Sequence, residues 1–230
     1  MYKCGFLLKM ISEANCMNSM KLRQKIADKI FKILDTIYSG EKTALFYETP
    51  FQLLIATILS AQCTDSQVNK VTETLFKKYT KPEDFLSVSQ EELEKDIRPT
   101  GFYKNKAKSL MGCSEVLIKL YGGKVPQTLE ELIKLPGVGR KTANCVLGAV
   151  YDIPGVVVDT HVKRLAKRMG LTEEINPDKI ELDLQKILPE EKWRRFSDLL
   201  IYHGRSICKA RNPNHESCPV NNICPSARES

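Results

Sequence analysis

The sequence predicts an all-α protein. Apolar residues recur at helical spacing along most of the chain, and Pro and Gly interrupt these runs at short intervals. The only candidate strand is Val156-Val157-Val158, which is too short to build a sheet. No internal repeat or low-complexity segment is visible. We therefore expect helices packed on helices and joined by short turns.

In the N-terminal half, each expected helix has an apolar face or a start signal. Residues 21–38 repeat apolar side chains at the spacing of one helix face. Pro50 opens a run that is apolar nearly all round, which is typical of a buried central helix. Asp65 or Ser66 is expected to cap the next helix, and shorter helices are expected over 83–88 and 90–97.

A hairpin between two helices dominates the next part of the chain. We expect a helix from about Asn105 to Tyr121, ended by two glycines. Thr128 should cap a helix over 129–135, and another helix should begin at Arg140 after the turn Pro136-Gly137-Val138-Gly139. Asp159 then precedes a helix that begins near Thr160.

Composition and charge exclude several classes of protein. With 42% hydrophobic and 27% charged residues, the chain is typical of a globular protein rather than a disordered one. No apolar run approaches the roughly 20 residues of a membrane span, so no membrane partner is expected. The net charge of +7 is too small to identify a partner by itself.

Two basic clusters are more informative than the net charge. They contain no acid, and their members are Lys163, Arg164, Lys167 and Arg168 in one cluster and Arg98, Lys104, Lys106 and Lys108 in the other. Such clusters neutralise phosphates, so they favour a polyanionic partner. A solvated helix face is the alternative that charge alone leaves open.

The turn at 136–139 has the pattern of a helix–hairpin–helix. Two glycines one residue apart let the backbone approach a ligand without a Cβ in the way. Amide groups at the start of the following helix then form a phosphate site that grips DNA without reading its sequence. The residues expected to contact DNA here are Gly137, Val138, Gly139 and Arg140. A tight turn between packed helices is the alternative.

Lys141 and Asp159 are the candidate catalytic residues. Lys141 lies in the first turn of its helix, where the macrodipole disfavours a cation and Arg140 adds a second positive charge. Asp159 is expected at a helix N-terminus, where the dipole favours a carboxylate. Taken alone, the lysine is typical of a phosphate contact and the aspartate of an N-cap. A capping aspartate is also rigidly positioned, so its two roles can coincide.

These motifs together resemble the endonuclease III family of DNA-repair enzymes. The resemblance rests on LPGVGRKTANCVLGAVY and VVVDTHVKRLAKRMGL, and it extends over about 21–225 through LLIATILSAQCTDSQVNKV and IRPTGFYKNKAKSL. It implies a bifunctional glycosylase and abasic-site lyase that acts on damaged pyrimidines in double-stranded DNA. Lys141 would attack the sugar C1′ of the flipped nucleotide to form a Schiff base. Asp159 would accept a proton and stabilise the positive charge on the sugar.

The resemblance also implies further roles and a domain organisation. Gln62 would fill the gap left in the duplex, and Phe102 would wedge at the estranged base, where the family usually has a smaller aliphatic residue. A six-helix domain would span 43–150, and a second domain would combine 21–42 with 151–230. Residues 1–20 would be an extension of unknown role. We expect the protein to act as a monomer.

Three cysteines in the last 23 residues indicate a metal site. The other five are scattered, which favours a reducing compartment over a disulfide scaffold. Gaps of six, two and five residues separate Cys208, His215, Cys218 and Cys224. The family has four cysteines at this spacing and binds a [4Fe–4S] cluster, so we expect these residues to be its ligands. Zinc held by three Cys and one His, or no metal, are the alternatives.

Other classes of protein fit these motifs less well. A monofunctional adenine glycosylase would lack Lys141 and carry a further C-terminal domain. A helix–hairpin–helix binding module would need neither Lys141 nor Asp159, and a redox protein would leave the hairpin unexplained. The expected location is the cytoplasm and nucleoid of a prokaryote, with the nucleus or mitochondrion as alternatives.

Overall fold

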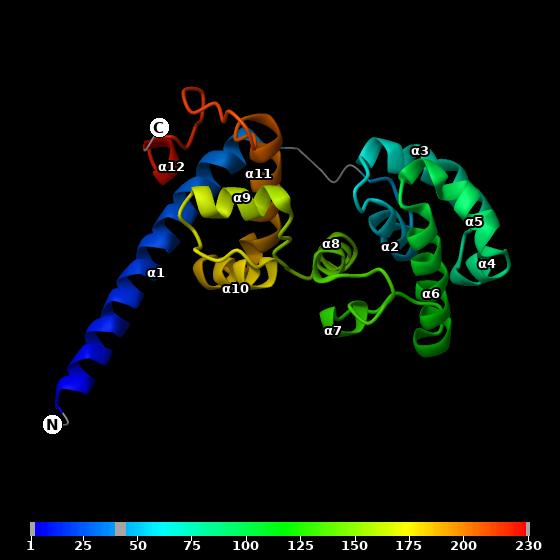
Figure 1. The fold of residues 1–230 in the computed structure, drawn as a ribbon, viewed down its shortest axis with the longest axis horizontal. Coiled ribbons are helices and arrows are strands. Elements are labelled where there is room, and N and C mark those ends of the chain that lie inside the picture. Colours follow the sequence, from blue (N-terminus) through cyan, green and yellow to red (C-terminus); the bar gives the residue numbers. More distant parts are fainter. Residues whose placement is uncertain (1–2, 40–44, 229–230) are drawn as a thin grey trace. The chain divides into compact units, whose positions relative to one another are not determined.

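The computed structural model describes residues 3–39 and 45–228 (Figure 1). Every regular element in these ranges is a helix, which confirms the all-α prediction. The candidate strand Val156–Val158 forms no ladder, and its three side chains are buried. None of the described helices is long and apolar enough to cross a membrane. The chain divides into two compact units, which are residues 42–155 and residues 1–41 together with 156–230.

The unit formed by residues 42–155 is built round one buried helix. Its elements are α2 (Pro50–Leu59), α3 (Asp65–Lys78), α4 (Pro82–Leu86), α5 (Gln90–Ile97), η1 (Arg98–Thr100), α6 (Tyr103–Tyr121), α7 (Leu129–Leu132) and α8 (Arg140–Val150). All residues of α2 from Phe51 to Leu59 are buried, as its all-round apolar pattern predicts. Thr49 caps α2 by accepting a hydrogen bond from the Gln52 amide.

Several predicted helix ends in this unit are wrong by a few residues. The N-cap of α3 is Thr64, not Asp65 or Ser66, because Thr64 is the extended residue whose hydroxyl accepts from the Gln67 amide. Helix α7 ends at Leu132 rather than at 135. The amides of Lys134 and Leu135 bond to carbonyls three residues back, which tightens the chain before Pro136.

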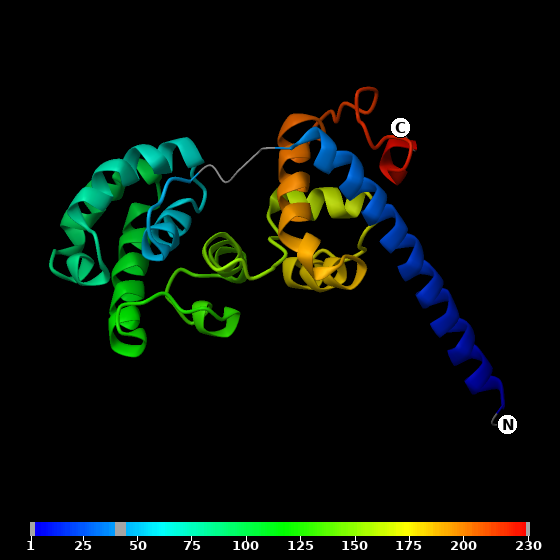
Figure 2. The same ribbon diagram turned by 180° about the vertical axis from the view of Figure 1, so that it is seen from behind.

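The other unit contains α1 (Lys3–Ile37), α9 (Thr160–Arg168), α10 (Pro177–Ile187), η2 (Glu190–Lys192), α11 (Trp193–Ser206) and α12 (Pro225–Arg228). Helix α1 packs against α10 and α11, and Figure 2 shows this unit from behind. The Arg195 guanidinium fixes the C-terminal end of α1 through the Asp35 carboxylate and the Tyr38 carbonyl, at 2.7 and 2.8 Å. Residues 3–20, expected as an N-terminal extension of unknown role, continue this same helix.

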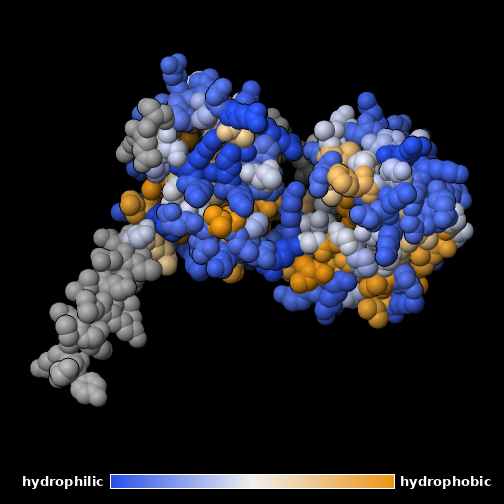
Figure 3. Space-filling view, in the orientation of Figure 1, coloured by the Kyte–Doolittle hydropathy of each residue, from blue (hydrophilic) through white to orange (hydrophobic). Residues whose placement is uncertain are grey.

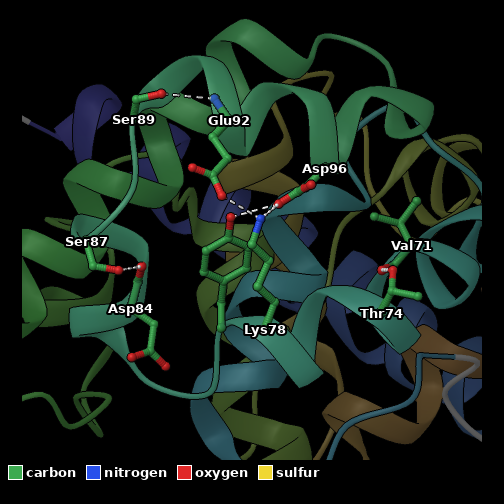
Figure 4. Close-up of polar contacts among 9 residues, drawn as sticks. Val71, Thr74, Lys78, Asp84, Ser87, Ser89, Glu92 and Asp96 are labelled. Atoms are coloured by element: carbon green, nitrogen blue, oxygen red, sulfur yellow. Dashed lines mark hydrogen bonds and ion pairs between the residues drawn. The ribbon is translucent and has the colours of Figure 1, made fainter.

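Polar contacts tie α3 to the end of α5 (Figure 4). The Lys78 ammonium lies 2.7 Å from Glu92 and 2.8 Å from Asp96. The hydroxyl of the buried Tyr79 donates to Asp96 at 2.7 Å. Burial, together with the hydrogen bond to Asp96, raises the pKa of Tyr79 to about 12, so the donor stays protonated. These contacts fix the chain just before η1.

The hairpin between α7 and α8 packs against the middle of α6. Gly137 has φ +78°, and a Cβ there would lie 2.7 Å from the Ser109 Cβ. A Cβ on Gly112 would likewise meet Pro136 at 3.2 Å. A Cβ on Gly139, by contrast, would meet no other part of the described chain within 4 Å. Gly137 therefore serves the close packing of the hairpin on α6, and only Gly139 lies open.

The two hairpin glycines should therefore respond differently to substitution. Gly137→Ala combines left-handed backbone strain with overlap on α6, and we expect it to lower the free energy of unfolding by about 2 kcal/mol or more. Gly139→Ala, the matched control, should cost less than about 1 kcal/mol as an N-cap change. Urea unfolding of both variants checks this; equal losses would contradict the assignment.

Candidate active site and nucleic-acid interface

Lys141 projects from a helix start that no side chain caps. The N-cap of α8 is Gly139, which has no side chain to accept a hydrogen bond from the first amides of the helix. Only backbone amides are therefore presented at the hairpin end of α8. The opposite face of α8 is buried through Ala143, Val146 and Leu147. Lys141 itself is exposed. The helix is thus anchored on one side and presents a primary amine beside a potential anion site on the other.

Asp159 is held rigidly at the start of α9. Its Oδ1 accepts a hydrogen bond from the Val162 amide at 2.8 Å, which makes it the N-cap. The Val157 amide donates to Ser197 Oγ of α11 at 3.0 Å, so the approach to the cap is also fixed. Burial lowers the pKa of the adjacent His161, which leaves that imidazole neutral at neutral pH. The carboxylate therefore has a defined position.

Lys141 and Asp159 belong to different units of the chain. Each is placed by its own helix, and both lie at helix N-termini, as the sequence predicts. One presents an amine in the first turn of its helix, and the other presents a half-buried carboxylate at the cap.

Three cations of the predicted basic clusters bind the chain itself. Arg164 donates to the carbonyls of Gly204 and Cys208, at 3.1 and 2.9 Å. Arg168 donates to the carbonyls of Lys209 and Ala210, at 2.7 and 3.0 Å. Lys106 is only 5% exposed and bonds to two carbonyls in its own unit. These hydrogen bonds direct the three side chains to carbonyls of the chain itself rather than to a phosphate, although the buried Arg164 Nε has no hydrogen-bond partner within the described residues.

The exposed members of those clusters remain suited to phosphate. They are Arg98, Lys104 and Lys108 in one cluster and Lys163 and Lys167 in the other. The face shown in Figure 3 is largely hydrophilic, and its hydrophobic residues gather in separate patches.

Gln62 and Phe102 occupy two strained, exposed turns of one unit. Gln62 follows α2 with φ +53°, and Phe102 precedes α6 with φ +48°. A non-glycine residue in this left-handed region costs roughly 1–2 kcal/mol. Phe102 is also 62% exposed, which is unfavourable for a large aromatic side chain. Strain and exposure of this kind are typical of residues that contact a ligand.

Three thiols gather in the core beside the C-terminal loop. Cys208, Cys218 and Cys224 are each 8–9% exposed and belong to one apolar cluster. Arg168 Nη1 lies 3.4 Å from the Cys208 sulfur, and His203 Nε2 lies 3.5 Å from the Cys218 sulfur. Nitrogen atoms in contact with buried sulfurs suit thiolates that ligate iron. The donor set therefore fits an iron–sulfur cluster.

Within the described ranges, no three His, Cys, Asp or Glu side chains converge on a single metal ion. A four-iron cluster has another requirement, because its four protein ligands bind four separate irons. His215, the fourth predicted ligand, is half-buried in the same loop, and its carbonyl accepts from the Cys218 amide at 3.3 Å.

Sequence reasoning missed the contribution of His203. This fully buried imidazole lies between Cys218 and the Tyr38 hydroxyl, which is 3.2 Å from its Nδ1. Burial lowers the pKa of His203 to about 4, so the ring is neutral, with one donor and one acceptor nitrogen. A lone histidine on an apolar helix gives no signal for this role.

Comparison with known proteins gives the chain a family. Residues 55–190 match the family of HhH-GPD superfamily base excision DNA repair proteins, and residues 208–224 match the iron–sulfur binding domain of endonuclease III. The second match confirms a [4Fe–4S] cluster as the cofactor in preference to zinc.

Relatives and solved structures agree with these matches. Endonuclease III of Synechocystis sp. is 46% identical over 218 residues, which cover 94% of this chain and 100% of the relative. The enzyme of Bacillus subtilis is 46% identical over 181 residues, covering 78% and 83%. A structure described as a trapped endonuclease III–DNA covalent intermediate is 42% identical, with a TM-score of 0.85 and coverage of 90% and 97%. The chain belongs to the endonuclease III family of base-excision-repair DNA glycosylases.

Proposed function

We propose that this chain removes damaged pyrimidines from duplex DNA through a Schiff base on Lys141 and then nicks the strand. The observation that carries the proposal is the exposed Lys141 amine in the first turn of α8. No side chain caps the start of this helix, and Gly139 just before it has open space where a Cβ would lie. The solved relative that is described as a covalent intermediate with DNA supports a covalent nucleophile in this family.

The reaction begins with a nucleotide that leaves the base stack. As the bond between the sugar and the base breaks, the sugar gains oxocarbenium character, which the Asp159 carboxylate stabilises. The Lys141 nitrogen forms a bond to C1′ as the base departs, and Asp159 accepts a proton from that nitrogen and passes it to the departing base. The C1′–O4′ bond then breaks, the remaining nitrogen proton passes to O4′, and the nitrogen becomes an imine with the opened sugar. The imine makes the 2′ proton acidic. Its removal and the departure of the 3′ phosphate complete the β-elimination.

The hairpin and the exposed cations of the two basic clusters bind the DNA backbone. The amides of Gly137, Gly139 and Arg140 bind phosphate without reading the sequence, and Gly139 has no Cβ to obstruct them. The Val138 amide already donates to the Leu135 carbonyl at 3.1 Å. The five exposed cations of the two basic clusters add charge neutralisation. Damaged double-stranded DNA is thus the proposed partner. We take the active form to be a monomer, since one chain carries both Lys141 and Asp159.

Gln62 and Phe102 are proposed to stabilise the extrahelical nucleotide. Gln62 fills the gap in the stack, and Phe102 wedges beside the estranged base. Their exposure in strained turns supports a function that needs them outside the core. Because Phe102 is larger than the aliphatic side chain usual in the family, it offers a wider stacking surface.

His215 is proposed as the fourth cluster ligand beside Cys208, Cys218 and Cys224. When bound, the cluster organises the C-terminal loop and takes no part in the Lys141 chemistry. Bacterial relatives support an assignment to the nucleoid.

Lys141→Gln should abolish imine formation while DNA binding persists, because the hairpin amides and exposed lysines remain. Asp159→Asn keeps an N-cap side chain and should therefore fold, with turnover lower by on the order of 100-fold. Borohydride trapping on abasic DNA and a binding titration measure both effects. Lys119→Gln, an exposed lysine elsewhere in this unit, is the control. Wild-type trapping by Lys141→Gln would refute the assignment.

Gln62→Ala should impair excision of a paired lesion by about tenfold, which corresponds to about 1.4 kcal/mol of lost stacking support. Cleavage of a ready-made abasic site needs less of this support and should fall by about threefold or less. Single-turnover rates on the paired lesion and on the abasic site test this difference between the two substrates, with Gln90→Ala as the control. Equal losses on both substrates would rule it out.

His215→Cys should lower the reduction potential of the cluster, because a thiolate adds a negative charge that neutral imidazole lacks. His215→Ala should lose iron and visible absorption during purification. Iron analysis, absorption spectra and electrochemistry give the readouts, and Glu216→Ala is the matched neighbour. A cluster in His215→Ala with the wild-type iron content and potential would remove His215 from the ligand set.

A further inference from the structure

We infer that Lys106 is a positioning residue that holds the turn of Gln62 and the turn of Phe102 at a fixed separation. The inference rests on the proposed insertion of these two side chains into the duplex. It concerns how the protein keeps them ready for that insertion.

The Lys106 ammonium joins the two turns directly. It donates to the carbonyl of Leu59 at 2.8 Å and to the carbonyl of Thr100 at 2.7 Å. Leu59 is the last residue of α2, three positions before Gln62. Thr100 is the last residue of η1, two positions before Phe102. A single side chain thus connects segments that are 41 positions apart in the sequence, from Leu59 to Thr100.

Both acceptors are groups that need a partner. Carbonyls at the end of a helix lack intrahelical donors and carry the negative end of the helix dipole. A cation is the favoured partner there, and its hydrogen bonds are charge-assisted. The side chain of Lys106 is buried, so water does not compete for these bonds.

Burial also has a cost at this position. Burial lowers the pKa of Lys106, although the nearby Cys63 thiol acts in the opposite direction. Desolvating an ammonium is unfavourable, whereas an aliphatic side chain would fill the same space without that cost. The two charge-assisted bonds offset the cost, and in doing so they fix the positions of both carbonyls.

The turns need such support because they are strained. Gln62 and Phe102 both have left-handed backbones, and Gly101 has φ +70° and ψ 161°, a conformation open only to glycine. Such conformations persist only where the surroundings determine them. The amide of Lys106 also donates to the Phe102 carbonyl at 3.1 Å, so this residue supports that turn from its backbone as well as its side chain.

Insertion into a duplex demands a fixed separation of the two tips. The gap left by a flipped nucleotide and the estranged base opposite it are a set distance apart in DNA. Side chains that drift relative to each other would fill one site and miss the other. The bridge by Lys106 removes that freedom before the DNA binds.

The test compares Lys106→Met, which keeps the volume and removes the donors, with Lys106→Gln, which keeps an amide donor. Lys119→Met, an exposed lysine of the same helix, is the control. Excision of a paired lesion and cleavage of a ready-made abasic site are measured in single turnover with the folded fraction fixed by urea unfolding. We expect Lys106→Met to lose about tenfold more on the paired lesion than on the abasic site, and Lys106→Gln to recover part of that loss.

A double-mutant cycle with Gln62→Ala gives a readout that a purely structural role would not move. If Lys106 acts by placing Gln62, the double variant should excise the paired lesion no more than about twofold more slowly than the slower single variant. The inference would be overturned if the rate losses of the two single variants multiplied in the double variant. It would also be overturned if Lys106→Met lost equally on both substrates. If Lys106→Met does not fold, Lys106→Gln enters the same comparison and cycle.

The outcomes separate this inference from the proposed function. Absence of a borohydride-trapped product with the wild-type chain would remove the Schiff-base function. Wild-type trapping together with equal losses on the two substrates would remove only the role of Lys106.

Discussion

Helix α6 is the support on which the parts of residues 42–155 that are proposed to contact DNA depend. At its N-terminus it continues from the Phe102 turn, and one turn later Lys106 reaches the carbonyl ends of α2 and η1. In the middle of α6, Ser109 and Gly112 pack closely against the hairpin that leads into α8. The close contact of Gly137 with Ser109 leaves no room for a side chain, so the start of α8 and its Lys141 inherit their position from α6. The proposed filler, wedge and nucleophile thus share a single rigid support.

Helix α9 has a comparable task in the other unit. At its N-terminus Asp159 serves as the cap, and the buried residues Val162 and Leu165 fix the helix in its core. Towards its C-terminus, Arg164 and Arg168 bind carbonyls of the loop that contains the proposed cluster ligands. The loop and the carboxylate are therefore attached to the same helix. Disorder in the loop would therefore disturb the position of Asp159 through loss of the hydrogen bonds that Arg164 and Arg168 make to the loop, rather than through direct contact.

The sequence predicts the parts of this arrangement that depend on local pattern. Helix positions follow from periodicity, and the N-cap role of Asp159 follows from a short polar residue before an amphipathic run. The roles of Lys106 and Arg168 could not be predicted, because a cation that binds phosphate and one that binds a carbonyl of its own chain look alike in a basic run. The close contact of Gly137 with Ser109 could not be predicted from the sequence either, since Ser109 lies in another helix. Tertiary partners, rather than local propensity, decide such cases.

The two catalytic candidates differ in how firmly they are held, and their chemistry requires the difference. A carboxylate that stabilises a developing positive charge works best when it is preorganised, and the cap hydrogen bond of Asp159 supplies that order. A nucleophile must shed its proton, form a bond and later be released, so its side chain needs room to move. Lys141 is exposed on an anchored helix, which gives it both a fixed origin and a mobile amine.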